Sequence, residues 1–223
     1  MRIVAFAFAV ASLLTDPVAG AATTKPLLLM HIESAPPPAS ARAAGASTLH
    51  IGDPAPALQP QMWLKGSAVG KYAKGRVYLV DFWATWCPPC IEAIPHLNAL
   101  QTKYASELTV VAVNVERLGG LRLEKGADGV LAFMKDRGEE MKYRVAMDDP
   151  ETEPVYRAWM AAAGLIGVPT VFIIDKQGRI AWVGTTAMKQ SYSFDEALRD
   201  TLAGKADLRR ARHLLATMNG SAR

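Results

Sequence analysis

The apolar residues of this chain fall into blocks separated by polar and turn-forming residues. The run from Val77 to Trp83 is nearly continuous and is typical of a buried β-strand. Asp175-Lys176-Gln177-Gly178 predicts a turn between two antiparallel strands, with Gly178 supplying the unusual backbone angle. In chain order, the pattern predicts a short strand or hairpin region around 58–73, a strand at 77–83, a helix at 88–105, a strand at 108–115, a helix at 128–138, a strand at 144–148, a helix at 152–163, strands at 170–175 and 179–184, and helices at 194–203 and 206–217. This alternation indicates an α/β fold.

The N-terminal region has a different pattern. Arg2 precedes an apolar stretch from Ile3 to Leu14, and Ala19-Gly20-Ala21 fits a cleavage site, so residues 1–21 are predicted to be an export signal. An uncleaved membrane anchor is the alternative, although the stretch is shorter than the ~20 residues that a spanning helix needs. Residues 22–49 are rich in Pro, Ala and Ser and predict a flexible linker. A periplasmic or otherwise extracytoplasmic location follows from the signal.

Composition favours one folded domain with extensions. The chain has 223 residues, of which 50% are hydrophobic, which is enough for a sizeable core. We assign this domain to residues 50–207, followed by a basic C-terminal helix or tail at 208–223, and we expect a monomer. The net charge of +4 is small and no nucleic-acid-binding motif is present, so we expect no nucleic-acid partner.

The chain has only two cysteines, Cys87 and Cys90, and they lie where the strand ending at Trp83 meets the next helix. Pro88 and Pro89 suit the first turn of that helix, where backbone N–H groups have no intrahelical partner. The partial positive charge of a helix N-terminus favours a Cys87 thiolate, which makes this sulfur the nucleophile. Cys90 lies one turn further and can resolve a mixed disulfide. This spacing predicts thiol–disulfide exchange.

Two structural interpretations compete with exchange. A disulfide that closes a loop of two residues would restrict the unfolded chain little, because the entropic gain grows with loop length. A zinc site needs about four ligands, and the nearest candidate, His96, has no second Cys-x-x-Cys or His pair to complete it. We therefore expect no metal, and no cofactor besides the redox-active disulfide of Cys87 and Cys90.

Three sequence features together resemble the thioredoxin superfamily: the stretch from Val80 to Cys90, Pro95, and Gly167-Val168-Pro169-Thr170. Within that superfamily the chain is most similar to exported TlpA-like thiol:disulfide oxidoreductases, over about 51–207. The resemblance implies a thioredoxin-like fold with an N-terminal extension and a central insertion of one helix and one strand.

The resemblance also implies a substrate-binding site. Pro169 matches the cis-proline of the thioredoxin fold, so Val168 would offer its N–H and C=O to an extended substrate peptide. Trp86 is expected to cover the cysteine face, whereas Trp83 is a candidate core residue. The competing interpretation of Pro169 is an ordinary turn proline.

Asp81 lies six residues before Cys87, where thioredoxins keep a buried carboxylate. An apolar strand raises the pKa of such a carboxyl group, so we predict that Asp81 is a general acid/base for Cys90. The alternative is a solvated aspartate at a strand end. Many TlpA-like chains carry a glutamate three residues after the second cysteine, but that position is Ala93 here. Glu92 is one residue earlier, which turns its side chain by about 100° on a helix, so it cannot simply inherit the role.

The two residues between the cysteines set the expected direction of the reaction. Pro88 and Pro89 have no N–H, so two backbone donors that could stabilise the Cys87 thiolate are absent. A less stable reduced form favours a reductase over an oxidase.

The sequence therefore predicts a thiol:disulfide oxidoreductase that reduces disulfides in extracytoplasmic proteins and receives electrons from a membrane-bound donor. The resemblance implies a cytochrome c apoprotein or a copper-site assembly protein as partner. A peroxiredoxin-type thiol peroxidase is one alternative, but it needs Thr-x-x-Cys and Thr85 is only two residues before Cys87. A non-catalytic peptide-binding module is the other.

Overall fold

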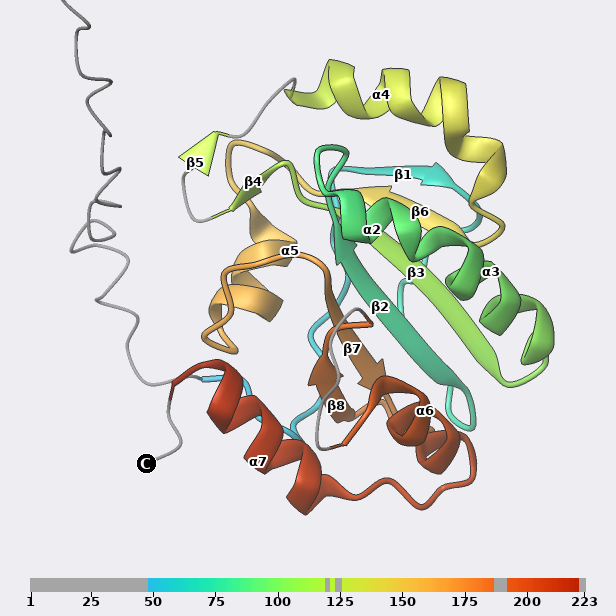
Figure 1. Ribbon diagram of the computed structural model, residues 1–223, viewed down its shortest axis with the longest axis vertical. Coiled ribbons are helices and arrows are strands. Elements are labelled where there is room, and N and C mark those ends of the chain that lie inside the picture. Colours follow the sequence, from blue (N-terminus) through green and yellow to red (C-terminus); the bar gives the residue numbers. More distant parts are fainter. Residues whose placement is uncertain (1–47, 119–120, 123–125, 187–191, 221–223) are drawn as a thin grey trace, which may run out of the picture. The chain divides into compact units, whose positions relative to one another are not determined.

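The structure is a computed structural model that describes residues 48–118, 121–122, 126–186 and 192–220. These residues form a six-stranded sheet in the order β1-β6-β3-β2-β7-β8, with helices packed around it (Figure 1). The predicted signal at 1–21 and all but the last two residues of the linker at 22–49 lie outside the described residues. No described helix has both the length and the apolar character needed to cross a bilayer.

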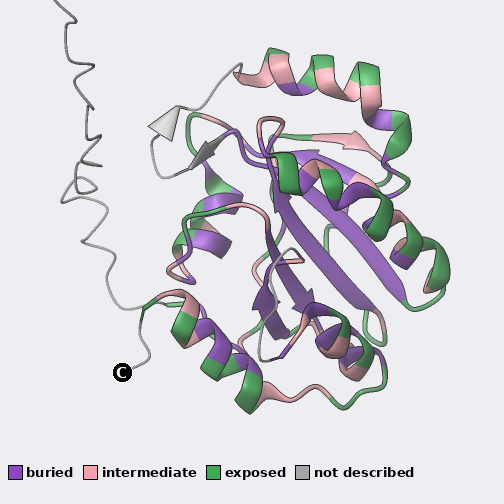
Figure 2. Cartoon of the chain, in the orientation of Figure 1, coloured by how far each residue is buried: buried purple, intermediate pink, exposed green. Residues whose placement is uncertain are grey.

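The central strand β2 (Val77–Trp83) pairs parallel with β3 (Leu108–Asn114) and antiparallel with β7 (Thr170–Ile174). Every residue of these three strands is buried, which explains their nearly continuous apolar sequences. β6 (Arg144–Met147) adds in parallel to β3, and β8 (Ile180–Gly184) adds antiparallel to β7. These five predicted strands are confirmed, and Figure 2 shows the buried residues concentrated along them.

The region around 58–73 contains one strand, β1 (Met62–Lys65), which forms no hairpin. It pairs antiparallel with β6, about 80 residues further along the chain, and forms one edge of the sheet. The structure adds a small hairpin of β4 (Arg117–Leu118) and β5 (Leu121–Arg122) that the pattern does not predict. The predicted central insertion is present as the helix α4 (Gly126–Arg137), a 3₁₀ turn η1 (Gly138–Glu140), and β6.

Two predicted helices are divided. The helix expected at 88–105 consists of α2 (Pro88–Glu92) and α3 (Ile94–Lys103), separated at Ala93. Pro95 is the second residue of α3 and has no N–H to donate a hydrogen bond to the preceding helical turn, which explains the break. The helix expected at 152–163 begins at Pro154 and runs from a short α5 (Pro154–Tyr156) into a π-helical turn η2 (Arg157–Ala161).

The two C-terminal helices are α6 (Phe194–Leu202) and α7 (Leu208–Met218). α6 begins with a capping box, in which the side chains of Ser193 and Glu196 each accept the other's backbone N–H. α7 packs on β8 and buries Ala211, Leu214 and Leu215 in the same core as the sheet (Figure 2). Although its sequence is basic, this helix is therefore part of the packed domain.

Candidate active site

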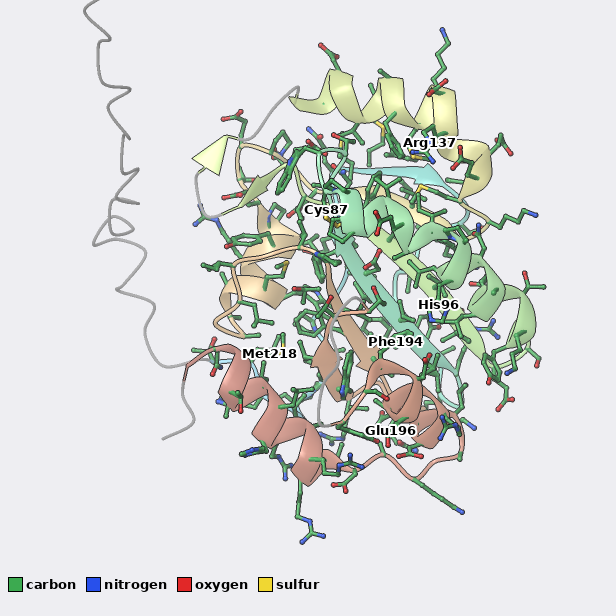
Figure 3. All side chains as sticks on the ribbon, viewed as in Figure 1. Cys87, His96, Arg137, Phe194, Glu196 and Met218 are labelled. Carbon is green, nitrogen blue, oxygen red and sulfur yellow. A yellow bond between two sulfur atoms is a disulfide. The ribbon has the colours of Figure 1, made fainter. Side chains whose placement is uncertain are left out.

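Cys87 and Cys90 form a disulfide at the junction of β2 and α2, with 5.3 Å between their Cα atoms (Figure 3). Cys87 is the N-cap of α2, and its Sγ accepts the backbone N–H of Cys90 at 3.3 Å. Pro88 and Pro89 occupy the first two positions of the helix and have no N–H. The first backbone donor of α2 therefore points at the sulfur of Cys87.

The disulfide is nearly enclosed. Each cysteine is only 3% exposed, whereas Pro88 and Pro89 between them are exposed. Trp86 is half-buried against the core, and its indole Nε1 has no hydrogen-bond partner among the described residues. Only a small area of the two cysteines is accessible to another molecule. The neighbouring surface must therefore position a partner disulfide next to them.

Asp81 lies inside the sheet on β2, in register with Ala112 of β3 and Val171 of β7. Its side chain is 2% exposed, and Oδ1 has no hydrogen-bond partner within the part of the chain that the structure describes. Burial raises the pKa of Asp81 to about 7. The predicted burial is confirmed, and a pKa raised toward neutral pH is what a general acid/base requires.

Tyr143, just before β6, is a neighbour of Asp81 that the sequence pattern does not single out. Its hydroxyl is buried and has no hydrogen-bond partner among the described residues. Burial, and then the charge of Asp81, raise the pKa of the Tyr143 hydroxyl. No local signal marks this tyrosine, because only the pairing of β6 with β3 brings it near β2.

Glu116 is a second buried carboxylate that the sequence reasoning missed. It is 6% exposed and accepts hydrogen bonds from the Thr85 N–H at 2.8 Å, the Thr85 hydroxyl at 3.1 Å and the Asn114 amide at 2.9 Å. Thr85 follows β2 and Glu116 follows β3, and parallel strands end at the same edge of a sheet. Glu116 thus holds the loop two residues before Cys87. An acidic residue directly after an apolar strand is the signal that could have identified it.

The peptide bond between Val168 and Pro169 is cis, as the resemblance implies. No hydrogen bond joins the main chain of Val168 to another described residue, whereas the Thr170 hydroxyl donates to the Gly167 carbonyl at 2.6 Å. Val168 and Pro169 are both half-buried. The main chain of Val168 is therefore available to pair with another chain.

An open groove joins this loop to the disulfide region. Its volume of about 410 Å³ is within the range of roughly 300–1,000 Å³ common for ligand sites. Its lining residues are Pro89, Gly164, Leu165, Ile166, Gly167, Val168, Pro169, Thr170, Thr185 and Met218. The predicted residues Pro89, Val168 and Pro169 therefore share one surface. Glu92 is exposed and Ala93 is buried, so Glu92 does not occupy the position of the glutamate found in many TlpA-like chains.

A dithiol pair at a strand-to-helix junction and a cis-proline in a mixed sheet define a thioredoxin-like protein. Solved structures agree with this fold. A thioredoxin-like protein in its oxidised form matches with a TM-score of 0.53 and 21% identity, over 69% of this chain and 97% of its own. A thiol-disulfide isomerase from Corynebacterium glutamicum matches with a TM-score of 0.53 and 20% identity, over 67% of this chain and 97% of its own.

The Redoxin family model matches residues 50–200, so the chain belongs to the Redoxin family. Protein FixW of Rhizobium leguminosarum is 27% identical over 65% of this chain and 65% of its own. Thioredoxin-like protein YneN of Bacillus subtilis is 33% identical over 53% of this chain and 62% of its own. Thiol-disulfide oxidoreductase ResA of Bacillus subtilis is 29% identical over 55% of this chain and 60% of its own. The chain thus spans slightly less than two-thirds of the length of these relatives.

Proposed function

We propose that this protein is a thiol:disulfide oxidoreductase that reduces disulfides in extracytoplasmic partner proteins through Cys87 and Cys90. The observation that carries the proposal is the Cys87–Cys90 disulfide at the end of β2, whose intervening Pro89 lines the same groove as the cis-proline Pro169. The family match and the relative named thiol-disulfide oxidoreductase ResA support the same activity.

The reaction begins from the reduced dithiol. The Cys87 thiolate attacks one sulfur of the substrate disulfide, which forms a mixed disulfide and releases the other substrate sulfur as a thiolate that takes up a proton. Cys90 then loses its proton and attacks Sγ of Cys87. This step restores the Cys87–Cys90 bond and releases the second substrate thiol. Two electrons pass from the enzyme dithiol to the substrate, and a dithiol of the membrane-bound donor returns them.

The surrounding residues have distinct proposed roles. Asp81 accepts the proton of Cys90 during the second step, because its raised pKa of about 7 suits proton transfer at neutral pH. Val168 pairs through its main chain with the substrate segment, and Trp86 and Pro169 form the adjacent surface. Pro88 and Pro89 withhold two N–H donors from the Cys87 sulfur, which favours reduction of the substrate.

The proposed partners are exported proteins that need reduced cysteines, such as a cytochrome c apoprotein or a copper-site assembly protein. This assignment rests on the resemblance to TlpA-like proteins and on the predicted export signal at 1–21. The surface beside the disulfide supports a protein substrate, because the backbone of Val168 there has no hydrogen-bond partner among the residues that the structure describes.

The proposal is tested by the equilibrium reduction potential of the Cys87–Cys90 pair in the full chain, titrated with glutathione or dithiothreitol. Tryptophan fluorescence reports the transition, since Trp86 directly precedes Cys87, and thiol alkylation provides a second readout. We expect a potential near the thioredoxin end of the scale, about −270 mV. A Cys87→Ser, Cys90→Ser double variant serves as the control and shows no transition.

A single Cys90→Ser variant identifies the nucleophile. It retains Cys87 and is expected to accumulate a mixed disulfide with substrate that dithiothreitol releases, whereas Cys87→Ser accumulates none. A potential near −120 mV, as in strong oxidants, would overturn the reducing direction. The absence of any reversible transition would overturn the redox activity and favour the peptide-binding module.

A further inference from the structure

We propose that the C-terminal helix α7 completes the groove beside the disulfide, through Met218, and makes it selective for protein segments that carry an apolar side chain next to the reacting cysteine. This inference rests on the proposed exchange activity and specifies the substrate class of the same site. The residues that carry it are Met218 and Ile166, neither of which the sequence motifs indicate.

The end of α7 contacts the segment that leads to the cis-proline. The Asn219 amide donates to the Ala163 carbonyl at 3.2 Å. A Cβ atom at Gly164 would lie 3.2 Å from Cβ of Asn219, which is a close contact, and Gly164 has a φ of +74° that favours glycine. Met218, the last residue of α7, is thereby held in the groove wall, on a different element from Cys87 (Figure 3).

The groove extends to the segment between the two cysteines, because Pro89 is one of its lining residues. Pro89 lies between the two cysteines in the sequence, and it lines the groove together with Val168 and Pro169. A substrate chain paired with the main chain of Val168 therefore passes the disulfide and places its neighbouring side chains toward Ile166 and Met218. Both cysteines are 3% exposed, so the exchange depends on such positioning.

The chemistry of the lining defines the substrate class. None of the ten lining residues carries a charge. Ile166 is 75% exposed, the largest value among the exposed large hydrophobic side chains of the described residues. Contact with an apolar substrate side chain would remove it from water, a gain of roughly 25 cal/mol per Å². Glutathione disulfide, by contrast, carries carboxylates that this lining offers no cation to bind. An apolar peptide segment therefore fits this groove better.

The test has a binding arm that involves no chemistry. Two fluorescent peptides of equal length carry serine in place of the reacting cysteine, flanked by leucine in one and by glutamate in the other. We expect the oxidised full chain to bind the leucine peptide about tenfold more tightly, as is common for one apolar contact. Ile166→Ala and Met218→Glu are each expected to reduce this ratio at least threefold.

Matched controls come from the edge strand β1 and from the helix α4. Met62 on β1 and Leu131 on α4 are 45% and 43% exposed and lie outside the groove. Met62→Glu and Leu131→Ala are expected to leave the peptide preference unchanged. Ile166→Ala removes a mostly exposed side chain and should not affect folding, so the test remains decisive even if Met218→Glu loosens α7.

The second arm measures exchange. The reduced full chain reacts with disulfide peptides of the same two flanking types and with glutathione disulfide. We expect the leucine preference to reappear in the rates of wild type and to fall in Ile166→Ala, and the rate with glutathione disulfide to be equal in wild type and the control Leu131→Ala. Equal binding of both peptides by wild type, or a preference that survives both groove variants, would overturn the inference. Binding selectivity without exchange would support the inference and overturn the proposed function alone.

Discussion

Two buried carboxylates, one within β2 and one just after β3, lie in contrasting surroundings. Glu116, two residues beyond the end of the inner strand β3, accepts three hydrogen bonds from Thr85 and Asn114. Asp81, inside the sheet, has an oxygen with no partner among the described residues, and burial raises its pKa to about 7. Hydrogen bonds stabilise a charged carboxylate, whereas burial without them favours the protonated form. Similar groups therefore serve different purposes: Glu116 holds the loop before Cys87, and Asp81 can exchange a proton.

The largest expected effect concerns the pH dependence of stability. The folded protein holds the Asp81 proton more tightly than the unfolded chain, in which aspartate has a pKa near 3.9. The contribution of Asp81 to the free energy of unfolding is therefore fully present below about pH 4. It is lost as the pH rises through about 7. Asp81→Asn should remove this loss and stabilise the protein at pH 8 by about 4 kcal/mol relative to wild type. Urea unfolding of both proteins between pH 4 and 8 measures the difference. Parallel pH profiles would show that folding does not raise the pKa of Asp81.

Removal of the second carboxylate should have the opposite effect. Glu116→Ala leaves the Thr85 N–H and the Asn114 amide without their acceptor, so we expect a loss of about 3 kcal/mol in the free energy of unfolding. Urea unfolding of the oxidised protein is the measurement. Glu92→Ala, at an exposed acidic residue on α2, is the control and should change stability by less than about 0.5 kcal/mol. A loss as small as that of the control would show that Glu116 does not hold the loop.

Substitutions of the two carboxylates should also differ in their effect on the reaction rate. Asp81→Asn cannot accept the proton of Cys90, so the release of the second substrate thiol should slow about 100-fold, within the usual range for a lost general base. Stopped-flow fluorescence of the reduced protein with a disulfide peptide resolves this step from the first attack. Glu116→Gln retains an acceptor oxygen for Thr85 and should slow the same step by much less. Equal losses in the two variants would refute the division of roles.

The smallest effect is expected at Tyr143. Its buried hydroxyl has no partner among the described residues, so Tyr143→Phe removes an unsatisfied polar group and should leave stability unchanged within about 0.5 kcal/mol or raise it slightly. Thermal unfolding at pH 6 is a suitable assay. A clear loss of stability would indicate that the hydroxyl has a hydrogen-bond partner. The conclusion that Oδ1 of Asp81 has no partner among the described residues would then need revision.

Local sequence was sufficient for the elements whose pattern is strong. The apolar run at 77–83 coincides with β2, and the pattern also located β3, β6, β7 and β8 to within one residue at each end. The division of the predicted helix at Ala93 beside Pro95 has a local cause, the missing N–H of the proline. The positions of Cys87, Cys90 and Pro169 could likewise be read from short motifs.

Contacts between distant segments could not be read in this way. β1 pairs with β6 across about 80 residues, and Glu116 reaches Thr85 only because β2 and β3 lie parallel in register. The basic residues of α7 are typical of a solvated helix face, yet the helix also has an apolar face that packs on β8 and carries Met218 into the groove.

The sequence by itself determined the strand-to-helix junction, the pair Cys87 and Cys90, and the place of Asp81 within an apolar strand, because each depends on residues that are neighbours in the chain. The tertiary structure decided which carboxylate has hydrogen-bond partners and which surface borders the disulfide. Those properties depend on strand register and on the docking of a distant helix, and both are set by the packing of the whole core rather than by local propensity.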